Sequence, residues 1–324
     1  MKISNSKITL WVLLAGLAQG AAAAYPERPI RVIVPFAPGG NVDLTARAVT
    51  PGMAELLGRN IVVDNRGGAG GAVGAEIVAT SAPDGYTLLV GSTGLLTIAP
   101  LVNSKLRYDP VRDFAAISLI SNVPLLMLVN ASYPAKTVKE FIAGAKSRGT
   151  ELTMASSGNF STGQLAGALF QTVTGVRMIH VPYKGASLAV LDLIGGRVDV
   201  MFDQFSSAVG HVRGGKVRAL AVTASARSPQ LPDVPTMREA DVKGVEAGTF
   251  TAILAPAGTP RDIVARLNEA VDKTLRTRFV SDSFAGYGAE TIGATPAASK
   301  AFIRDEIAKW KKVMNAAGIK PQPQ

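Results

Sequence analysis

Small hydroxyl-bearing residues and glycines follow strand-like runs at several places in this sequence. In the first, Ile30–Val34 is a β-branched run, Phe36–Gly40 is a Pro/Gly loop, and an amphipathic segment begins at Leu44. Glycine permits positive φ and close approach of a ligand to the backbone, and Asn41 or Asp43 can cap the new helix. Unpaired N–H groups at a helix start favour an anion such as a carboxylate. The alternative is an ordinary strand-to-helix turn.

The same chemistry recurs at later strand ends. Residues 91–94, 156–163 and 182–185 each follow an apolar run and precede a segment with helical periodicity. Asp203 ends another run, where its carboxylate can accept a hydrogen bond from a ligand amine or hydroxyl, or cap the following helix. Ligands of open α/β sheets bind beyond the carboxyl ends of the strands. This repetition in two halves of the chain predicts a cleft between two lobes.

A hydrolytic site is a competing interpretation. Ser161 lies between a predicted strand and a helix, in a segment close to the G-x-S-x-G nucleophile elbow but without its first glycine. The two histidines are His180 and His211. The order Ser161, Asp203, His211 matches serine hydrolases of this fold class, and Asp199 could replace Asp203 as the acid. The alternative function is therefore an exported serine hydrolase that uses Ser161 with Asp203 and His211.

Nucleotide and metal sites are poorly supported. The glycine-rich segment Gly67–Gly74 reads G-x-G-x-x-x-G rather than G-x-G-x-x-G, and it follows a second strand rather than the first. No clustered His/Asp/Glu spacing indicates a metal site. We therefore predict no metal and no cofactor.

Strand-like and helix-like segments alternate along nearly the whole chain. With 324 residues, 47% of them hydrophobic, the chain is long enough for two domains. The alternation predicts an α/β fold with largely parallel sheets. Ile117–Ile120 and Leu125–Val129 read as two apolar runs separated by Asn122–Pro124. Near the end of the chain, Ile303, Ile307, Trp310 and Met314 recur at helical spacing, which places Trp310 in the core.

The first 24 residues are typical of a secretory signal peptide. Lys2 and Lys7 give a positive start, Ile8–Ala18 is apolar, and small residues precede a predicted cleavage between Ala24 and Tyr25. The apolar segment spans about 11 residues, whereas a membrane helix requires ~20. The sequence therefore predicts an exported, periplasmic protein.

Composition excludes several other classes. The chain contains no cysteine, which excludes thiol catalysis, cysteine metal sites and disulfides. The net charge is +10, and removal of Lys2 and Lys7 leaves 10 − 2 = +8. The basic residues are scattered rather than gathered on one arm or face, so we predict no nucleic-acid partner. A basic surface can still attract anionic solutes.

A series of short motifs, taken together, is specific to one family. They cover the chain in order: Tyr25–Ile30, Pro35–Gly40, Asp43, Ala46–Arg47, Pro83–Leu88, Tyr108–Pro110, Asp113–Phe114, Ser156–Gly158, Val181–Gly185, Val198–Asp199, Phe202–Asp203, Leu231–Thr236 and Leu254–Pro260. With these motifs the sequence resembles the Bug family, the exported solute receptors of the tripartite tricarboxylate transporter type.

The resemblance implies a two-lobed periplasmic-binding-protein fold, type II-like, with the ligand cleft between the lobes. Residues 1–24 would be the signal peptide, residues 25–124 plus 252–324 lobe one, and residues 125–251 lobe two. It implies capture of a small carboxylate-bearing metabolite by hinge closure, for uptake or sensing, without catalysis. The implied partners are that ligand and the membrane components of a tripartite transporter or a sensor. We expect a monomer.

The resemblance also implies the ligand-facing residues. From lobe one they are Phe36, Ala37, Pro38, Gly39, Gly40, Ser92, Thr93 and Gly94. From lobe two they are Ser156, Ser157, Gly158, Phe160, Ser161, Thr162, Tyr183, Lys184, Gly185, Ala186 and Asp203. The sequence departs from the family where Phe160 replaces a usual glycine, where Gly163-Gln164 replaces a Gln-His pair, and where Phe250 replaces a tryptophan. Phe160 would either cap a ligand or pack inward.

Overall fold

The computed structural model describes residues 25–147 and 152–321 of the chain. The predicted signal peptide, residues 1–24, lies outside the described residues. The strands are β1 (Ile30–Val34), β2 (Ile61–Asn65), β3 (Thr87–Ser92), β4 (Phe114–Asn130), β5 (Leu152–Ser156), β6 (Met178–Pro182), β7 (Val200–Gln204), β8 (Val217–Val222), β9 (Gly248–Pro256) and β10 (Glu290–Thr291). The helices are α2 (Asn41–Leu57), η2 (Ala69–Gly71), α3 (Ala72–Ala79), η3 (Gly94–Ile98), α4 (Ala99–Val102), α5 (Val138–Ser147), α6 (Thr162–Thr174), α7 (Ala186–Ile194), α8 (Phe205–Arg213), α9 (Arg261–Leu275), α10 (Arg278–Gly286) and α11 (Pro296–Ala316).

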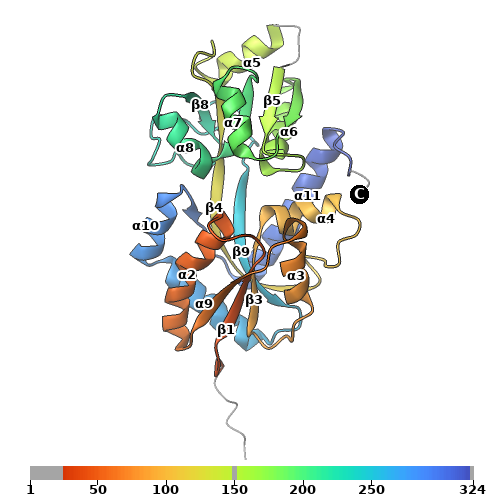
Figure 1. The fold of residues 1–324 in the computed structure, drawn as a ribbon, viewed down its shortest axis with the longest axis vertical. Coiled ribbons are helices and arrows are strands. Elements are labelled where there is room, and N and C mark those ends of the chain that lie inside the picture. The colour runs from red at the N-terminus through yellow and green to blue at the C-terminus, as the bar shows by residue number, and fades with distance from the viewer. Residues whose placement is uncertain (1–24, 148–151, 322–324) are drawn as a thin grey trace, which may run out of the picture.

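The strands form two lobes that share one long strand. The order is β2-β1-β3-β9-β4-β7-β5-β6, and β8 and β10 also pair with β4. Sheet A, in lobe one, contains β1, β2, β3, β9 and β10 with the first part of β4. Sheet B, in lobe two, contains the second part of β4 with β5 to β8. The lobes lie one above the other, joined by β4 and β9 (Figure 1).

The strand directions place the carboxyl ends of strands from both lobes in the region between the lobes. β4 runs from sheet A into sheet B, and β9 is antiparallel to both β4 and β3. β3 and its parallel neighbour β1 therefore point toward lobe two. β7 is antiparallel to β4, so β7 and its parallel neighbour β5, with β6 beyond, point toward lobe one. The carboxyl ends of both sets meet between the lobes, as the predicted cleft requires.

The structure corrects two features of the sequence interpretation. The sheets are mixed rather than largely parallel, because β4 and β9, which join the lobes, run antiparallel to the strands beside them. The two apolar runs around Asn122–Pro124 are one continuous 17-residue strand, β4. Pro124 pairs with Gly248 in sheet A, and Leu125 pairs with Gln204 in sheet B. Proline has no N–H to donate to a ladder. Its place at the change of sheet explains why a continuous strand looks interrupted in the sequence.

The last helix, α11, packs against both lobes. Ile303, in its first half, packs with the sheet A core beside Leu254 and Phe250. Trp310 and Met314, in its second half, pack in the lobe two core that also contains Phe170 and Phe202. Trp310 is fully buried, as its helical spacing predicts. α11 is thus a third connection between the lobes (Figure 1).

Close packing of α6 on β7 gives a test of this fold. A Cβ at Gly163 would lie 2.3 Å from the backbone oxygen of Phe202, so Gly163→Ala must push α6 away from β7. We expect the free energy of unfolding to fall by about 1–3 kcal/mol in urea titrations. Gly144→Ala in α5 is the matched control, because no described atom outside its own helix turn lies within 4 Å of that Cβ. The control should be neutral or stabilising by up to ~1 kcal/mol. Equal stability of the two variants would contradict this packing.

Candidate functional site

A cavity of about 400 Å³ lies between the two lobes. Lobe one and the connecting strands line it with Ser92, Gly94, Ile98, Leu125 and Thr249. Lobe two lines it with Ser157, Phe160, Ser161, Thr162, Gly163, Ala186, Phe202, Asp203, Gln204, Ser206 and Ser207. The lining is rich in hydroxyl groups and comes from the carboxyl ends of β3, β5 and β7 and the helix starts that follow them.

The structure brings together eight of the predicted site residues at this cavity. They are Ser92, Gly94, Ser157, Phe160, Ser161, Thr162, Ala186 and Asp203. The others lie elsewhere: Phe36, Ala37, Pro38, Gly39 and Gly40 on the loop before α2, and Thr93, Ser156, Gly158, Tyr183, Lys184 and Gly185 beside or behind the lining residues.

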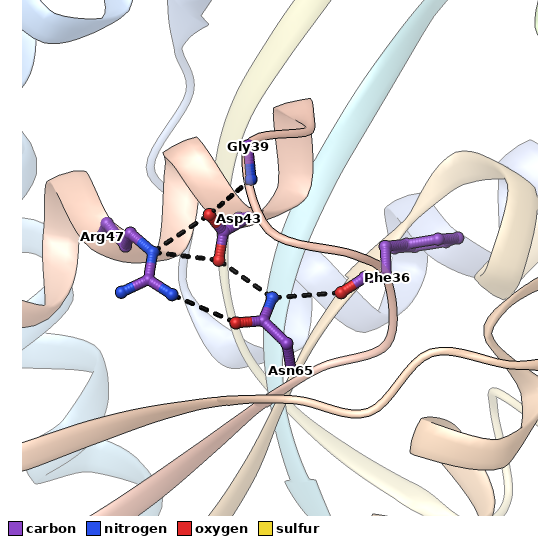
Figure 2. Close-up of polar contacts among 5 residues, drawn as sticks. All are labelled: Phe36, Gly39, Asp43, Arg47 and Asn65. Atoms are coloured by element: carbon purple, nitrogen blue, oxygen red, sulfur yellow. Dashed lines mark hydrogen bonds and ion pairs between the residues drawn. The ribbon is translucent and has the colours of Figure 1, made fainter.

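The loop before α2 is fixed by one buried carboxylate. The Oδ2 atom of Asp43 accepts a hydrogen bond from the Gly39 N–H at 2.9 Å, and Arg47 Nε lies 3.0 Å from both carboxylate oxygens. Asn65 donates to Asp43 at 2.9 Å and to the Phe36 carbonyl at 3.0 Å. Figure 2 shows Asp43 at the centre of this network and the Phe36 ring turned away from it.

This network corrects the predicted helix cap. Asp43 and Asn41 both lie inside the helix, the N-cap is Gly40, and no described side chain caps it. Asp43 instead reaches back to the N–H of Gly39, whose φ of +86° is the positive value expected of glycine, whereas Gly40 is extended. The Gly39 N–H is therefore already bonded, and the donors left for an anion are those of the first helical turn.

The hydrogen-bond partners of Asp43 keep its carboxyl group ionised. Burial raises the pKa of this carboxyl, but hydrogen bonds from Arg47, Gly39 and Asn65 together outweigh it and leave the pKa below its ordinary value of 3.8. Asp43 is 2% exposed, and Arg47 lies on the next turn of α2. The carboxylate is thus ionised at neutral pH and shapes the loop.

Several predicted ligand residues outside the cavity lining make hydrogen bonds within the protein, and their contact with a ligand stays a prediction. The Thr93 hydroxyl accepts from the Phe250 N–H at 2.8 Å, which fixes β3 to β9. The Ser156 hydroxyl lies 2.7 Å from His180 Nε2 and donates to the Gly158 carbonyl at 2.9 Å. The Tyr183 hydroxyl donates to Asp192 at 2.6 Å. Their polar groups hold the shape of the loops that reach the cavity.

Phe160 occupies an unusual backbone conformation at the cavity wall. Its φ is +59°, a value that side-chain-bearing residues rarely adopt. The Gln164 carboxamide oxygen accepts the Phe160 N–H at 2.5 Å and so holds the loop. Glycine adopts such a positive φ far more readily than phenylalanine does. Phe160 lines the cavity and also packs against the lobe two core, so its inward packing is observed, and its capping of a ligand stays a prediction.

Asp203 supplies the one charged side chain of the cavity lining. It is 5% exposed, and the Ser207 hydroxyl donates to its carboxylate at 2.7 Å. Burial raises its pKa above the ordinary 3.8, although the Ser207 hydrogen bond acts in the opposite direction. Among the described lining residues none is cationic. An anion here would therefore be held by hydroxyl groups and backbone amides.

Helix starts provide those amides. α7 begins after Gly185 and α8 after Gln204, and neither start has a capping hydrogen bond from a described side chain. α6 differs, because the Ser161 hydroxyl accepts from the Gln164 N–H at 3.3 Å. The first-turn N–H groups of α7 and α8 are thus available near Ala186 and Ser206, and the helix dipole favours negative charge there.

The sequence interpretation missed some lining residues. Gln204, Ser206 and Ser207 directly follow Asp203, so their hydroxyl and amide groups at a strand end were a usable signal. Thr249 lies at the start of β9, where its hydroxyl is 3.3 Å from that of Thr162 and 3.2 Å from Gln204 Nε2. Gly163 ends the loop 156–163 that the pattern marked, whereas Ile98, Leu125 and Phe202 are apolar and gave no signal.

The hydrolase alternative lacks its geometry. Ser161 caps α6, and Asp203 accepts from Ser207. Within the described parts of the chain, no hydrogen bond joins Ser161, Asp203 and His211. His180 lies in β6, as predicted, and its ring nitrogen contacts Ser156 rather than Ser161.

Comparison with known proteins agrees with the fold and the cleft. A family model described as the tripartite tricarboxylate transporter family receptor, TctC, matches residues 45–319. The chain belongs to this family. BugT of Bordetella pertussis is 37% identical over 315 residues, which are 97% of this chain and 97% of BugT. The resemblance to Bug-type receptors that the motifs indicated is therefore confirmed.

Two solved structures similar to this chain carry small carboxylates. MatC from Rhodopseudomonas palustris with bound malate is 38% identical, has a TM-score of 0.71, and is matched over 89% of this chain and 99% of MatC. R. palustris Rpa4515 with adipate is 37% identical, has a TM-score of 0.77, and is matched over 92% of this chain and 100% of that chain. Within the described residues, the receptor has no helix with the length and hydropathy of a membrane span.

The Asp43 network predicts a pH-dependent contribution to stability. Asp43→Asn removes the charge that Arg47 and the Gly39 N–H contact, so we expect the free energy of unfolding to fall by about 1–3 kcal/mol at pH 7. Because the folded pKa lies below 3.8, this contribution is present above 3.8 and is lost as the pH falls through the folded value.

Urea unfolding of both proteins between pH 7 and pH 3 measures this difference. Asp305→Asn, which removes an exposed pair with Arg304, is the control and should stay within about 0.5 kcal/mol of the unmodified protein. The network would be contradicted if the difference in free energy of unfolding between Asp43→Asn and the unmodified protein did not become smaller at low pH.

Proposed function

We propose that this receptor captures a small carboxylate-bearing metabolite in the interlobe cavity by hinge closure, for uptake or sensing. The observation that carries the proposal is the cavity itself, where hydroxyl groups and two uncapped helix starts converge from facing strand ends. A volume of about 400 Å³ suits a small metabolite. The malate and adipate held by the related receptors support the ligand class.

Hydrogen bonds and helix dipoles can supply the binding free energy of a micromolar complex without a cationic residue. A micromolar complex requires about 8 kcal/mol. The starts of α7 and α8 contribute about 0.3–1 kcal/mol each, which is at most about 2 kcal/mol together. Three or four charge-assisted hydrogen bonds from hydroxyl and amide donors, at about 1.5–3 kcal/mol each, supply the remainder. Closure of the lobes sheds water and strengthens each of these bonds.

The hinge follows from the strands that cross between lobes. The resemblance implies residues 25–124 plus 252–324 for lobe one and residues 125–251 for lobe two, and we propose this division with one change. The change of β4 from sheet A to sheet B between Pro124 and Leu125 supports the first boundary. Because β9 pairs within sheet A from Gly248 onward, the return to lobe one fits better at Gly248 than at residue 252. The second half of α11 rests on lobe two and must follow its rotation.

The protein acts by binding rather than catalysis. Its family is one of receptors. We further propose that residues 1–24 are removed on export to the periplasm, that the loaded receptor is monomeric, and that it meets the membrane components of a tripartite transporter or a sensor. The family description supports the transporter as partner.

A ligand screen with one cleft variant tests the function. Adipate and malate should each raise the melting temperature of the protein, and NMR should recover them unchanged. Ala186→Asp puts a carboxylate at the first residue of α7, where it suits the helix dipole but competes with the ligand for the N–H groups. We expect at least a tenfold loss of affinity, because like charges about 4 Å apart cost roughly 4 kcal/mol at an effective dielectric constant of 20.

Ser187→Asp is the matched control for this variant. It adds the same charge to the next residue, which is exposed and outside the cavity lining, so affinity should stay within about threefold. No melting shift with either acid, or equal losses in both variants, would refute capture in this cavity.

Asp203 is expected to decide between ligands with and without a hydroxyl group. Its buried carboxylate repels an anion but can accept a hydrogen bond from a ligand hydroxyl. Asp203→Asn should therefore bind adipate at least threefold more tightly at pH 7, while the affinity for malate rises less or falls. Isothermal titration with both acids measures the ratio. If the affinities for adipate and malate changed by the same factor, Asp203 would not discriminate between ligands by their hydroxyl group.

A further inference from the structure

A second cavity, of about 600 Å³, lies along α6, the helix whose first residues line the interlobe cavity. It is bounded by α6, by the edge strand β6 with the segment before it, and by the end of α11. It shares no lining residue with the interlobe cavity, so it is a separate site within the described chain. We call it the rear groove.

The rear groove has polar groups that nothing in the described protein uses. Arg177 is exposed at its rim, and among residues 25–147 and 152–321 no hydrogen bond or ion pair engages its guanidinium. Gln164 and Gln171 use their carboxamide oxygens to accept the N–H groups of Phe160 and Met178. Their NH₂ groups, which donate no hydrogen bond within those residues, belong to side chains that line the groove.

The remainder of the wall is apolar. The buried residues Met154, Ala168, Val176 and Met178 line it, and Ile319 closes the groove from the segment after α11. Thioether side chains adapt to ligands of differing shape. A single free guanidinium beside such a wall suits one carboxylate attached to a short apolar chain, because guanidinium binds carboxylate in a bidentate manner.

We propose that the rear groove is a second binding site, for a small amphipathic monocarboxylate, with Arg177 holding the carboxylate and Met154 and Met178 contacting the apolar chain. A dicarboxylate suits it less, since one cation is present at the rim for two charges. The volume lies in the usual range of small-molecule sites.

Two lining residues connect the rear groove to the interlobe cavity. The Gln164 oxygen holds the N–H of Phe160, whose ring lines the interlobe cavity. His180 Nε2 lies 2.7 Å from the Ser156 hydroxyl, which also donates to the Gly158 carbonyl. Both contacts end on the loop at the cavity wall. A groove ligand that contacts Gln164 or His180 would therefore alter the affinity of the cleft; this coupling, unlike the groove itself, rests on the proposed function.

Hexanoate is the probe for the test. Two-dimensional NMR of the ¹⁵N-labelled protein should show saturable shifts of the Ala168, Gly175, Val176 and Ala317 amides. Arg177→Gln should weaken this binding at least tenfold. Arg107→Gln is the matched control, because Arg107 is also exposed and has no partner within the described chain, but lies in lobe one. It should leave the affinity unchanged.

The same titration separates failure of the groove from failure of the proposed function. In Ala186→Asp the groove shifts should persist while adipate binding is lost. Saturating hexanoate should change adipate affinity at least twofold in the unmodified protein and not in Arg177→Gln. Shifts confined to Gly94 and Thr162, or equal hexanoate affinity in both arginine variants, would overturn the groove. Groove shifts without adipate binding would refute the cleft proposal alone.

Discussion

The antiparallel pairing of β4 with β9 is the constraint on which the remaining architecture depends. β4 extends through sheet A and sheet B, so every other strand takes its direction from it. β3 and β1 then point toward lobe two, and β7 and β5 point toward lobe one. The carboxyl ends of strands from both lobes meet in one place, and the helices that follow them direct their N-termini there. The cleft is a consequence of strand direction.

Hydrogen bonding inside the protein decides which donors remain for a ligand. Asp43 takes the N–H of Gly39, Thr93 joins β3 to β9, and Ser161 caps α6. These bonds within the protein fix the loops and strands around the cleft. The starts of α7 and α8 keep their first-turn donors, since neither Gly185 nor Gln204 caps them with its side chain within the described chain. A receptor without a cationic lining can thus present positive potential from backbone alone.

The loop around Phe160 connects the lobe two core to the wall of the interlobe cavity. A residue other than glycine at φ +59° is strained, and the Gln164 hydrogen bond offsets that strain. This hydrogen bond joins Gln164, which lines the rear groove, to Phe160, which lines the interlobe cavity. α11 adds a comparable link at larger scale, because its two halves pack in the cores of different lobes. A rotation of one lobe against the other would therefore displace part of α11, whose end lines the rear groove.

The sequence by itself determined the α/β class, the two facing halves, the family and the burial of Trp310, because these rest on local periodicity and on motifs in chain order. It also located eight residues of the cavity, since hydroxyl and glycine residues at strand ends mark a ligand edge. Tertiary structure alone decided that β4 is unbroken at Pro124, that Asp43 reaches back to Gly39, and that Ile98 and Leu125 reach the cavity. These features depend on partners far apart in the chain, and the residue type does not reveal whether a hydroxyl or an N–H group is already bonded to such a partner.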